Sequence, residues 1–561
     1  MLVRFFSVAI LLAIAPATRA FAQDRPLATP QLTFDLQTPN SGRLSLSESI
    51  AIALSRNPAL AIERMRVDAA AAVTEAERGN LQPLLNVSQA SFKRDNVVAS
   101  RFYPTGLYID SENATRAAVE SKTFLGGTVT AGLDYRKLTS SSNIQTLSPQ
   151  YSTNLIFGVQ QPLLRDFGYD KAQAAIRLAE QRARVAEQTF VQAAARLISQ
   201  TEEEYWRLSF AREQVDVTRR SRDAAARLAA QADTLFGAGK AAPSTVQQAR
   251  AALAQREEDV IGAAADADSV EDRLKLLLRI DLTSRVTPTE SVARSGGPEP
   301  GPAIVNAAAT ISRAAGPVDP KASIESALRR RPELIALESE RVQRDIELSM
   351  AKNLLLPRLD LNAQYTRTGM AGVPSIVCVD PTVPDCVPAG VGVPESIFAS
   401  MTTAGDAFDS LVMRNPFDGW SAELRLQVPL GMRTAKARRT EAELKLAESR
   451  LRLEAARDEV VKDVREAVRQ AATAQARFDA ARQVAAFVRT QFTTARTQFD
   501  AGLASTSDVV RSQDDLDRAI LNELKTEMEL NIALARVRLA DMTVLDDHPI
   551  AAPSRTVAGT K

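Results

Sequence analysis

One long internal repeat constrains the fold of this chain more than any other feature of its sequence. In each copy a first proline follows a polar run and a second proline ends the next helix. The two prolines lie 25 residues apart in both copies, at Pro58 and Pro83 in the first and at Pro332 and Pro357 in the second. The chain is therefore expected to fold as two related structural units.

A strand-like alternation follows the second proline of each copy. Aliphatic residues alternate with polar ones at Leu85 and Val87, and again at Leu359 and Leu361. The block before Pro429 repeats this pattern with charged residues on the second face. A period of two is typical of a half-buried strand in a soluble protein, or of a barrel strand between lipid and water. The charged residues and flanking aromatic residues favour the barrel strand.

The first copy carries additional strand material between these blocks. Residues 114–138 read as a hairpin that turns at Gly126 and Gly127, and the sequence does not decide whether this hairpin joins the barrel wall. The second copy instead has a loop rich in glycine, proline and aspartate over about 369–419.

One long helix follows the last strand of each copy. Segments 170–236 and 434–500 each run for 67 residues without proline, which corresponds to helices about 100 Å long. Aliphatic residues recur every seven positions at Leu446, Leu453 and Val460. This spacing is typical of a coiled-coil seam.

Each long helix ends at an aromatic residue and a glycine, where the chain is expected to reverse. Gly239 and Gly502 take the same place in the two copies, 263 residues apart. Glycine tolerates the left-handed backbone that commonly ends a helix. Shorter helices are then expected to return over 245–281 and 507–545.

The segment around Gly239, "GAGK", resembles a phosphate-binding loop only superficially. That motif requires an earlier glycine and a hydroxyl after the lysine, whereas this chain has Thr234 and Ala241 there. The preceding residues read as a helix rich in alanine and arginine, not as a buried strand. We interpret both glycines as hairpin tips. Ser244 is the candidate N-cap of the first returning helix, and Ser505 and Thr506 are the candidates for the second.

The N-terminus has the pattern of a secretory signal peptide. Arg4 precedes an apolar run over 5–15, and a small-x-small site at 20–22 predicts cleavage before Gln23. No later segment approaches the roughly 18–20 apolar residues of a spanning helix. The mature chain is expected to be exported, and to be either soluble or embedded in a membrane as strands.

Charge and residue counts exclude several classes of function. The 69 basic and 68 acidic residues give a net charge of +1, which offers no electrostatic basis for nucleic acid as a partner. The single histidine, His548, cannot build a histidine metal site or a catalytic triad. Carboxylates alternate with basic residues along helical faces, as on solvated helices. We expect no enzyme activity, no metal and no cofactor.

The two cysteines, Cys378 and Cys386, lie in the segment "VCVDPTVPDCVP". Their short spacing and the export signal predict a disulfide that closes a small extracellular loop. Two free thiols are the alternative.

These patterns divide the chain into five parts. They are a signal peptide (1–22), a first repeat (44–282), a linker rich in proline and glycine (283–320), a second repeat (321–545) and a C-terminal tail (546–561).

The duplicated order of these features resembles the TolC-type outer membrane efflux protein family over about 44–544. The matching pieces are "ESIAIALSRNPAL", the Pro-Leu pairs at 162 and 429, and the tips "FGAGKAAPSTV" and "FDAGLASTSDVV". The resemblance implies a mainly α fold with a membrane β-barrel. Three copies would share one barrel in the outer membrane of a Gram-negative bacterium, and their long helices would form a tapering α-barrel tunnel in the periplasm. Two strands per repeat would give twelve in the trimer, the number favoured here, and the extra hairpin would raise it to eighteen.

The function implied by the resemblance is a passive exit duct for small molecules. Its tips would dock with a periplasmic adaptor protein, itself coupled to an inner-membrane pump. The residues expected to form these docking tips are Gly239, Lys240, Ala241, Ala242, Gly502, Leu503, Ala504 and Ser505.

A gate is expected just behind the tips. The aspartate that rings the constriction in the family matches Asp508, while Arg511 and Thr245 stand where further acidic residues would be. Such a gate would attract cations less than two acidic rings would. Alternatively, Asp508 is only a carboxylate that stabilises the start of a helix.

Two other functions fit parts of the sequence. The same duct could serve a type I protein secretion system and carry an unfolded protein. A surface coiled-coil protein is the third possibility, and it predicts no amphipathic strands between the helices.

Overall fold

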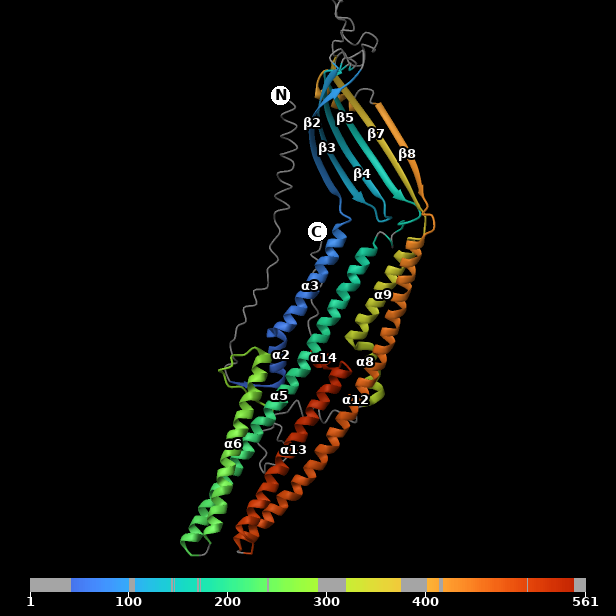
Figure 1. Ribbon diagram of the computed structural model, residues 1–561. Helices are drawn as coiled ribbons and strands as arrows, with labels where there is room; N and C mark the ends of the chain where they lie inside the picture. Colours follow the sequence, from blue (N-terminus) through green and yellow to red (C-terminus); the bar gives the residue numbers. More distant parts are fainter. Residues whose placement is uncertain are drawn as a thin grey trace, which may run out of the picture. The chain divides into compact units, whose positions relative to one another are not determined.

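The computed structural model describes most of the chain as helices and one large sheet (Figure 1). The described residues are 42–99, 106–142, 145, 147–168, 171, 173–239, 242–290, 319–374, 401–412, 417–501 and 503–548. They fall into two compact units, and each unit combines residues of both repeats. The first contains the described residues of Val73–Glu180 and Gln343–Leu446, and the second those of Thr33–Ala72, Gln181–Val342 and Ala447–Lys561.

The first unit contains a six-stranded sheet in which every neighbouring pair of strands is antiparallel. In spatial order the strands are β2 (Leu84–Val97), β3 (Leu107–Lys122), β4 (Thr128–Ser140), β5 (Leu147–Pro162), β7 (Arg358–Pro374) and β8 (Phe417–Gln427). The strands of the two repeats meet where β5 pairs with β7.

The hairpin β3–β4 is part of this sheet, so the expectation of four strands per chain is wrong. Both strands of the hairpin are paired along their length, β3 with β2 and β4 with β5. The hairpin turns at Gly126, as the sequence predicts, and this residue has a φ of +87°. At the turn the amide of Thr123 donates to the carbonyl of Gly127 at 2.7 Å.

Two parts of the expected loop over 369–419 have regular structure. Strand β7 continues to Pro374, and helix α11 (Ala404–Val412) packs on β5 and β7. Gly369 permits this contact, because a Cβ atom there would lie 2.1 Å from the carbonyl oxygen of Ala407. The loop prediction is therefore wrong over 369–374 and 404–412.

Four helices form the two long helical hairpins expected from the sequence. They are α5 (Ala174–Gly237), α6 (Pro243–Leu278), α12 (Arg433–Asp500) and α13 (Thr506–Ala540). Leu453 and Val460 of the predicted seam are buried in one cluster with Leu530 and Val537 of α13. The seam prediction is confirmed at these positions, because both side chains pack against the partner helix of the hairpin.

Shorter elements lie before the strands of each repeat and after the helical hairpins. They are β1 (Arg43–Leu44), α2 (Leu46–Arg56) and α3 (Pro58–Gly79) in the first repeat, β6 (Thr287–Pro288) after α6, α8 (Pro320–Arg330) and α9 (Pro332–Asn353) in the second repeat, and α14 (Val544–Asp547) after α13. Pro58 and Pro332 each stand at the first position of a helix, where the missing amide proton is not needed.

A serine caps the first short helix, but not its counterpart. Ser45 and Glu48 form a capping box at the start of α2. In the second repeat the cap of α8 is Asp319, whose side chain accepts from the amide of Lys321. The N-cap of α8 is therefore an aspartate, where the N-cap of α2 is a serine.

The largest core belongs to the second unit. Tyr205, Ile198 and Leu208 of α5 are fully buried and pack in one cluster with Leu44 and Ile50. The cluster also includes residues from α6 and α13, so it joins α2 to both helical hairpins.

Candidate functional site

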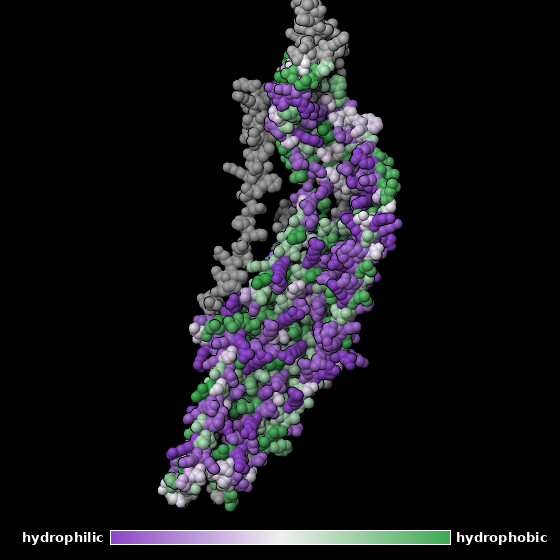
Figure 2. All heavy atoms as spheres, in the orientation of Figure 1, coloured by the Kyte–Doolittle hydropathy of each residue, from purple (hydrophilic) through white to green (hydrophobic). Residues whose placement is uncertain are grey.

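One face of the six-stranded sheet carries a continuous apolar band. Residues paired across antiparallel strands point to the same side of a sheet, so the register defines the face. The band consists of Leu85, Val87, Val119, Ala117, Val129, Ala131, Leu133, Leu155, Phe157, Val159, Leu359, Leu361, Ala363, Ala422, Leu424 and Leu426. Leu424 and Leu426 are 62% and 61% exposed, and Figure 2 shows hydrophobic residues along the β8 side of the sheet.

Aromatic residues border this band on four neighbouring strands. They are Tyr135, Tyr151, Tyr365 and Trp420. From Leu359 to Tyr365 the band of β7 extends roughly 20 Å, close to the ~25 Å apolar belt of outer-membrane strands with its aromatic girdles.

The opposite face of the same sheet is polar and charged. Arg136 pairs with Glu112 at 2.8 Å, and Arg425 pairs with Glu423 at 2.9 Å. Asn362, in register with Glu423, belongs to the same face. A sheet with an exposed apolar face and a charged opposite face suits a boundary between lipid and water.

The two edges of the sheet are long and open. Strands β2 and β8 are outermost in the order of strands, and all but one of the residues of β2 and all of β8 are exposed. Among the described residues no other strand pairs with their outer edges. Such edges are templates for another chain. The sheet also contradicts the surface coiled-coil alternative, which predicts no amphipathic strands.

The tips of the two helical hairpins lie in the second unit. Gly239 lies in the turn just after the first long helix, has a φ of +72° and is exposed, as the hairpin prediction requires. At the other tip Leu503 is 81% exposed, with Ala504 and Ser505 beside it in the chain. Ala242 begins the return of the first hairpin. Of the expected tip residues, Lys240, Ala241 and Gly502 lie outside the described residues.

Asp508 takes part in a capping box at the start of α13. The amide of Ser505 donates to its carboxylate at 3.1 Å, and the amide of Asp508 donates to the Ser505 hydroxyl at 3.3 Å. The Ser505 hydroxyl also donates to this carboxylate, at 2.6 Å, and this bond together with the one from the Ser505 amide holds the pKa of Asp508 below its ordinary value. Ser505 is thus confirmed as the N-cap. The described contacts give Asp508 the helix-stabilising role, and Arg511 lies exposed one turn further along.

The first hairpin returns without a side-chain cap. Helix α6 begins with Pro243 at its first position, and Ala242 takes the N-cap place without a side-chain hydrogen bond. The expectation that Ser244 caps this helix is therefore wrong, because proline starts it one residue earlier. Thr245 lies half-buried in its first turn.

Polar contacts that the sequence did not reveal tie the two hairpins together behind the tips. Arg256 of α6 forms an ion pair with Asp514 of α13. The Ser221 hydroxyl of α5 donates to the buried carboxylate of Asp517, which also accepts from Gln513 at 2.8 Å. Burial raises the pKa of Asp517, while its hydrogen bonds act in the opposite direction. In the sequence these contacts are marked only by polar residues that recur at helical spacing.

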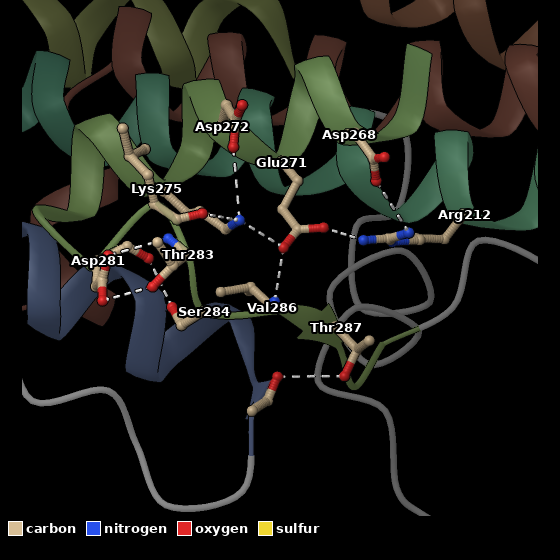
Figure 3. A network of polar contacts seen from close by, with 12 residues as sticks. Arg212, Asp268, Glu271, Asp272, Lys275, Asp281, Thr283, Ser284, Val286 and Thr287 are labelled. Atoms are coloured by element: carbon tan, nitrogen blue, oxygen red, sulfur yellow. Dashed lines mark hydrogen bonds and ion pairs between the residues drawn. The ribbon is translucent and has the colours of Figure 1, made fainter. Parts of the chain in front are cut away.

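A second network surrounds Glu271 of α6 (Figure 3). Its side chain is 3% exposed and forms ion pairs with Arg212 of α5 and with Lys275, whose Nζ lies 2.8 Å from it. It also accepts a hydrogen bond of 2.9 Å from the amide of Val286. Lys275 in turn donates to the carbonyl of Leu282 at 3.0 Å. The network therefore holds the segment after α6 against the helices.

Three further features are the cysteines, the helices that could span a membrane and the possible metal ligands. Cys378 and Cys386 lie outside the described residues. None of the described helices is long and apolar enough to cross a bilayer. Within the described ranges no three His, Cys, Asp or Glu side chains come together as a possible metal site.

Comparison with known proteins identifies the class. The profile of the outer membrane efflux protein family matches residues 50–278 and 323–541. These two segments correspond to the two repeats and cover most of the chain, so the chain belongs to the outer membrane efflux protein family. Members of this family are outer membrane channels and not enzymes, and membership places the chain in the outer membrane.

Solved structures show the same fold. A membrane protein from Pseudomonas aeruginosa has a TM-score of 0.57 and 16% identity, with 88% of this chain and 93% of that chain covered. The CmeC outer membrane channel of Campylobacter jejuni has a TM-score of 0.56 and 14% identity, with 88% and 85% covered. The open state of the MtrE outer membrane channel of Neisseria gonorrhoeae has a TM-score of 0.56 and 14% identity, with 88% of both chains covered. No curated protein matches the sequence significantly. The expected mainly α fold with duplicated strand and long-helix units is confirmed.

Proposed function

We propose that this protein is the exit duct of a tripartite efflux system, through which small molecules leave the periplasm passively. The observation that carries the proposal is the sheet with an exposed apolar face, a charged opposite face and two open edges. A sheet edge cannot stay open in hydrocarbon, because its backbone groups would have no partners there.

In a homotrimer the open edges of the three sheets would pair with one another. The six strands alternate in direction, so β2 and β8 run oppositely and β8 of one copy can pair antiparallel with β2 of the next. Three six-stranded sheets joined in this way close one barrel of eighteen strands, with the apolar band against lipid and the charged face inside. Cyclic symmetry leaves no edge unpaired.

The periplasmic end of this duct is proposed to close behind the hairpin tips. Arg256–Asp514 and Ser221–Asp517 tie one hairpin to the other, so opening would require these contacts to break. Asp508, Arg511 and Thr245 are proposed to line the constriction beyond them. The exposed small and apolar tip residues are proposed to receive the periplasmic adaptor, and through it the inner-membrane pump.

Conductance in planar lipid bilayers tests the duct and its gate together. We expect low conductance from the native trimer, and a severalfold higher one from Arg256→Gln combined with Asp517→Ala, because the ion pair and the hydrogen bond between the hairpins are both removed. Arg250→Gln is the matched control. Arg250 is an exposed arginine of α6 whose partner Asp233, at 3.0 Å, lies in the same hairpin, so its loss should leave conductance unchanged. If neither the native protein nor the double variant conducts, the protein is not a duct.

The docking role of the tips is tested by Leu503→Asp. Leu503 is 81% exposed, and a charge placed there should remove the apolar contact with an adaptor while trimers still form. We expect loss of chemical crosslinks to the adaptor and loss of export in cells.

Ile261→Asp provides the matched control for this experiment. Ile261 is a similarly exposed aliphatic residue of α6, 71% exposed, but it lies away from the tip and should retain crosslinking. If the Leu503→Asp trimers crosslink and export like the native protein, the docking assignment is wrong.

A further inference from the structure

A hollow lies in the first unit where β8 passes into α12. It has a volume of about 640 Å³. Its lining includes Arg165, Leu354, Pro429, Leu430, Arg433 and Arg438. Three arginines and several apolar side chains thus share one hollow, with no acidic residue in its lining.

The arginines of this hollow have few partners. Arg433 and Arg438 belong to no ion pair among the described residues. The Nε of Arg165 lies 3.5 Å from the carboxylate of Asp166, whose side chain is 61% exposed, and it makes no hydrogen bond among the described residues. The first turn of α12 contains no acidic residue. Basic residues at a helix N-terminus are disfavoured by the helix dipole, so this cluster calls for an anion that offsets the positive charge.

The apolar part of the hollow continues the lipid-facing band. Leu430 is 99% exposed, and the alternation of apolar residues continues past the end of β8 through Val428 to Leu430. A freely exposed leucine beside three arginines is unusual for a surface that meets only water. A partner with both a negative charge and a hydrocarbon tail would satisfy both halves of the hollow.

We propose that this hollow binds an anionic glycerophospholipid of the outer membrane. The three guanidinium groups hold the lipid phosphate, since arginine donates to phosphate in a planar, bidentate geometry. Leu430 and Val428 contact the first part of an acyl chain. The inference rests on the proposed placement of the apolar band against lipid, and it adds a specific lipid site at the membrane boundary.

Native mass spectrometry of the full-length protein in detergent tests the site. Phosphatidylglycerol and phosphatidylethanolamine are added at equal concentration, and bound lipids are counted. We expect the native protein to prefer phosphatidylglycerol, and Arg165→Gln/Arg433→Gln/Arg438→Gln to lose this preference by roughly tenfold or more.

A matched control removes the same number of positive charges from α12, the helix that contains Arg433 and Arg438. Arg450, Arg465 and Arg496 are exposed residues of α12 outside the hollow, and their replacement by glutamine should leave the preference intact. Leu430→Ser should weaken retention of phosphatidylglycerol, whereas millimolar inorganic phosphate should not displace it. Displacement by phosphate would show a simple anion site and overturn the lipid assignment.

Two other outcomes overturn the proposal. Equal binding of both lipids by the native protein would show that the hollow does not select anionic lipid. Loss of trimers in the triple arginine variant, with the lipid preference unchanged, would show that a second copy of the chain fills the hollow. Conductance of the same preparations separates this test from the proposed function. A trimer that conducts but shows no lipid preference loses only the lipid site.

Discussion

Replacing Glu271 with alanine is expected to open the segment after α6. The side chain of Glu271 is 3% exposed, and it is the shared acceptor for Arg212, for Lys275 and for the amide of Val286. Its removal leaves the Lys275 ammonium, itself only 6% exposed, without its buried partner. Breaking a buried ion pair by deleting one member costs about 3–5 kcal/mol. We expect the Val286 amide to exchange hydrogen at least roughly a hundredfold faster.

Asp272→Ala is the matched control for this experiment. Asp272 also lies near Lys275, at 3.5 Å, but its side chain is 57% exposed, and exposed pairs contribute only ~0–1 kcal/mol. Exchange at Val286 should therefore change little in this variant. Equal protection in Glu271→Ala and in the native protein would contradict the anchoring role of the network.

The helical hairpins could be predicted closely from the sequence. Segment 434–500 corresponds to α12 (Arg433–Asp500), and 245–281 corresponds to α6 (Pro243–Leu278). The signals are local. The absence of proline permits the length of each long helix, and Gly239 marks where the first of them stops. These signals act within a few residues, so they do not depend on what the helix packs against.

The number of strands required information that the sequence does not carry locally. The alternation of residues 114–138 is the same whether the hairpin joins the sheet or lies on its surface. The pairing of β4 with β5 places the hairpin in the sheet. The sequence of neither strand specifies which strand it pairs with. Repeat symmetry favoured four strands, but the second repeat lacks a counterpart of this hairpin.

The contacts between hairpins were hidden for a related reason. Arg256 and Asp514 each lie on a helical face rich in charge, where a solvated surface is the usual interpretation. Glu271 and Lys275 read as an ordinary pair four residues apart on an exposed helix. They are buried because α5 and the chain after α6 pack over them, and only the tertiary fold determines this.

Replacing Leu424 with arginine is expected to prevent assembly in the membrane. Leu424 lies in the middle of the apolar band of β8, in register with Leu361. A charged side chain on the lipid face near the bilayer centre costs about 2–4 kcal/mol, and a trimer would carry this cost three times. We expect the folded trimer, measured by semi-native gel electrophoresis of membranes, to be largely lost.

Asn362→Arg places the same side chain at the same depth on the opposite face. Asn362 is in register with Glu423, next along the strand to the Leu361–Leu424 pair. The new arginine would lie near a carboxylate on the face proposed to contact water, so trimers should form as in the native protein. The contrast between the two variants reports which face meets lipid, because charge, size and depth are matched. If Leu424→Arg assembles normally while Asn362→Arg does not, the apolar band faces the interior of the assembly, and the proposed orientation of the sheet is reversed.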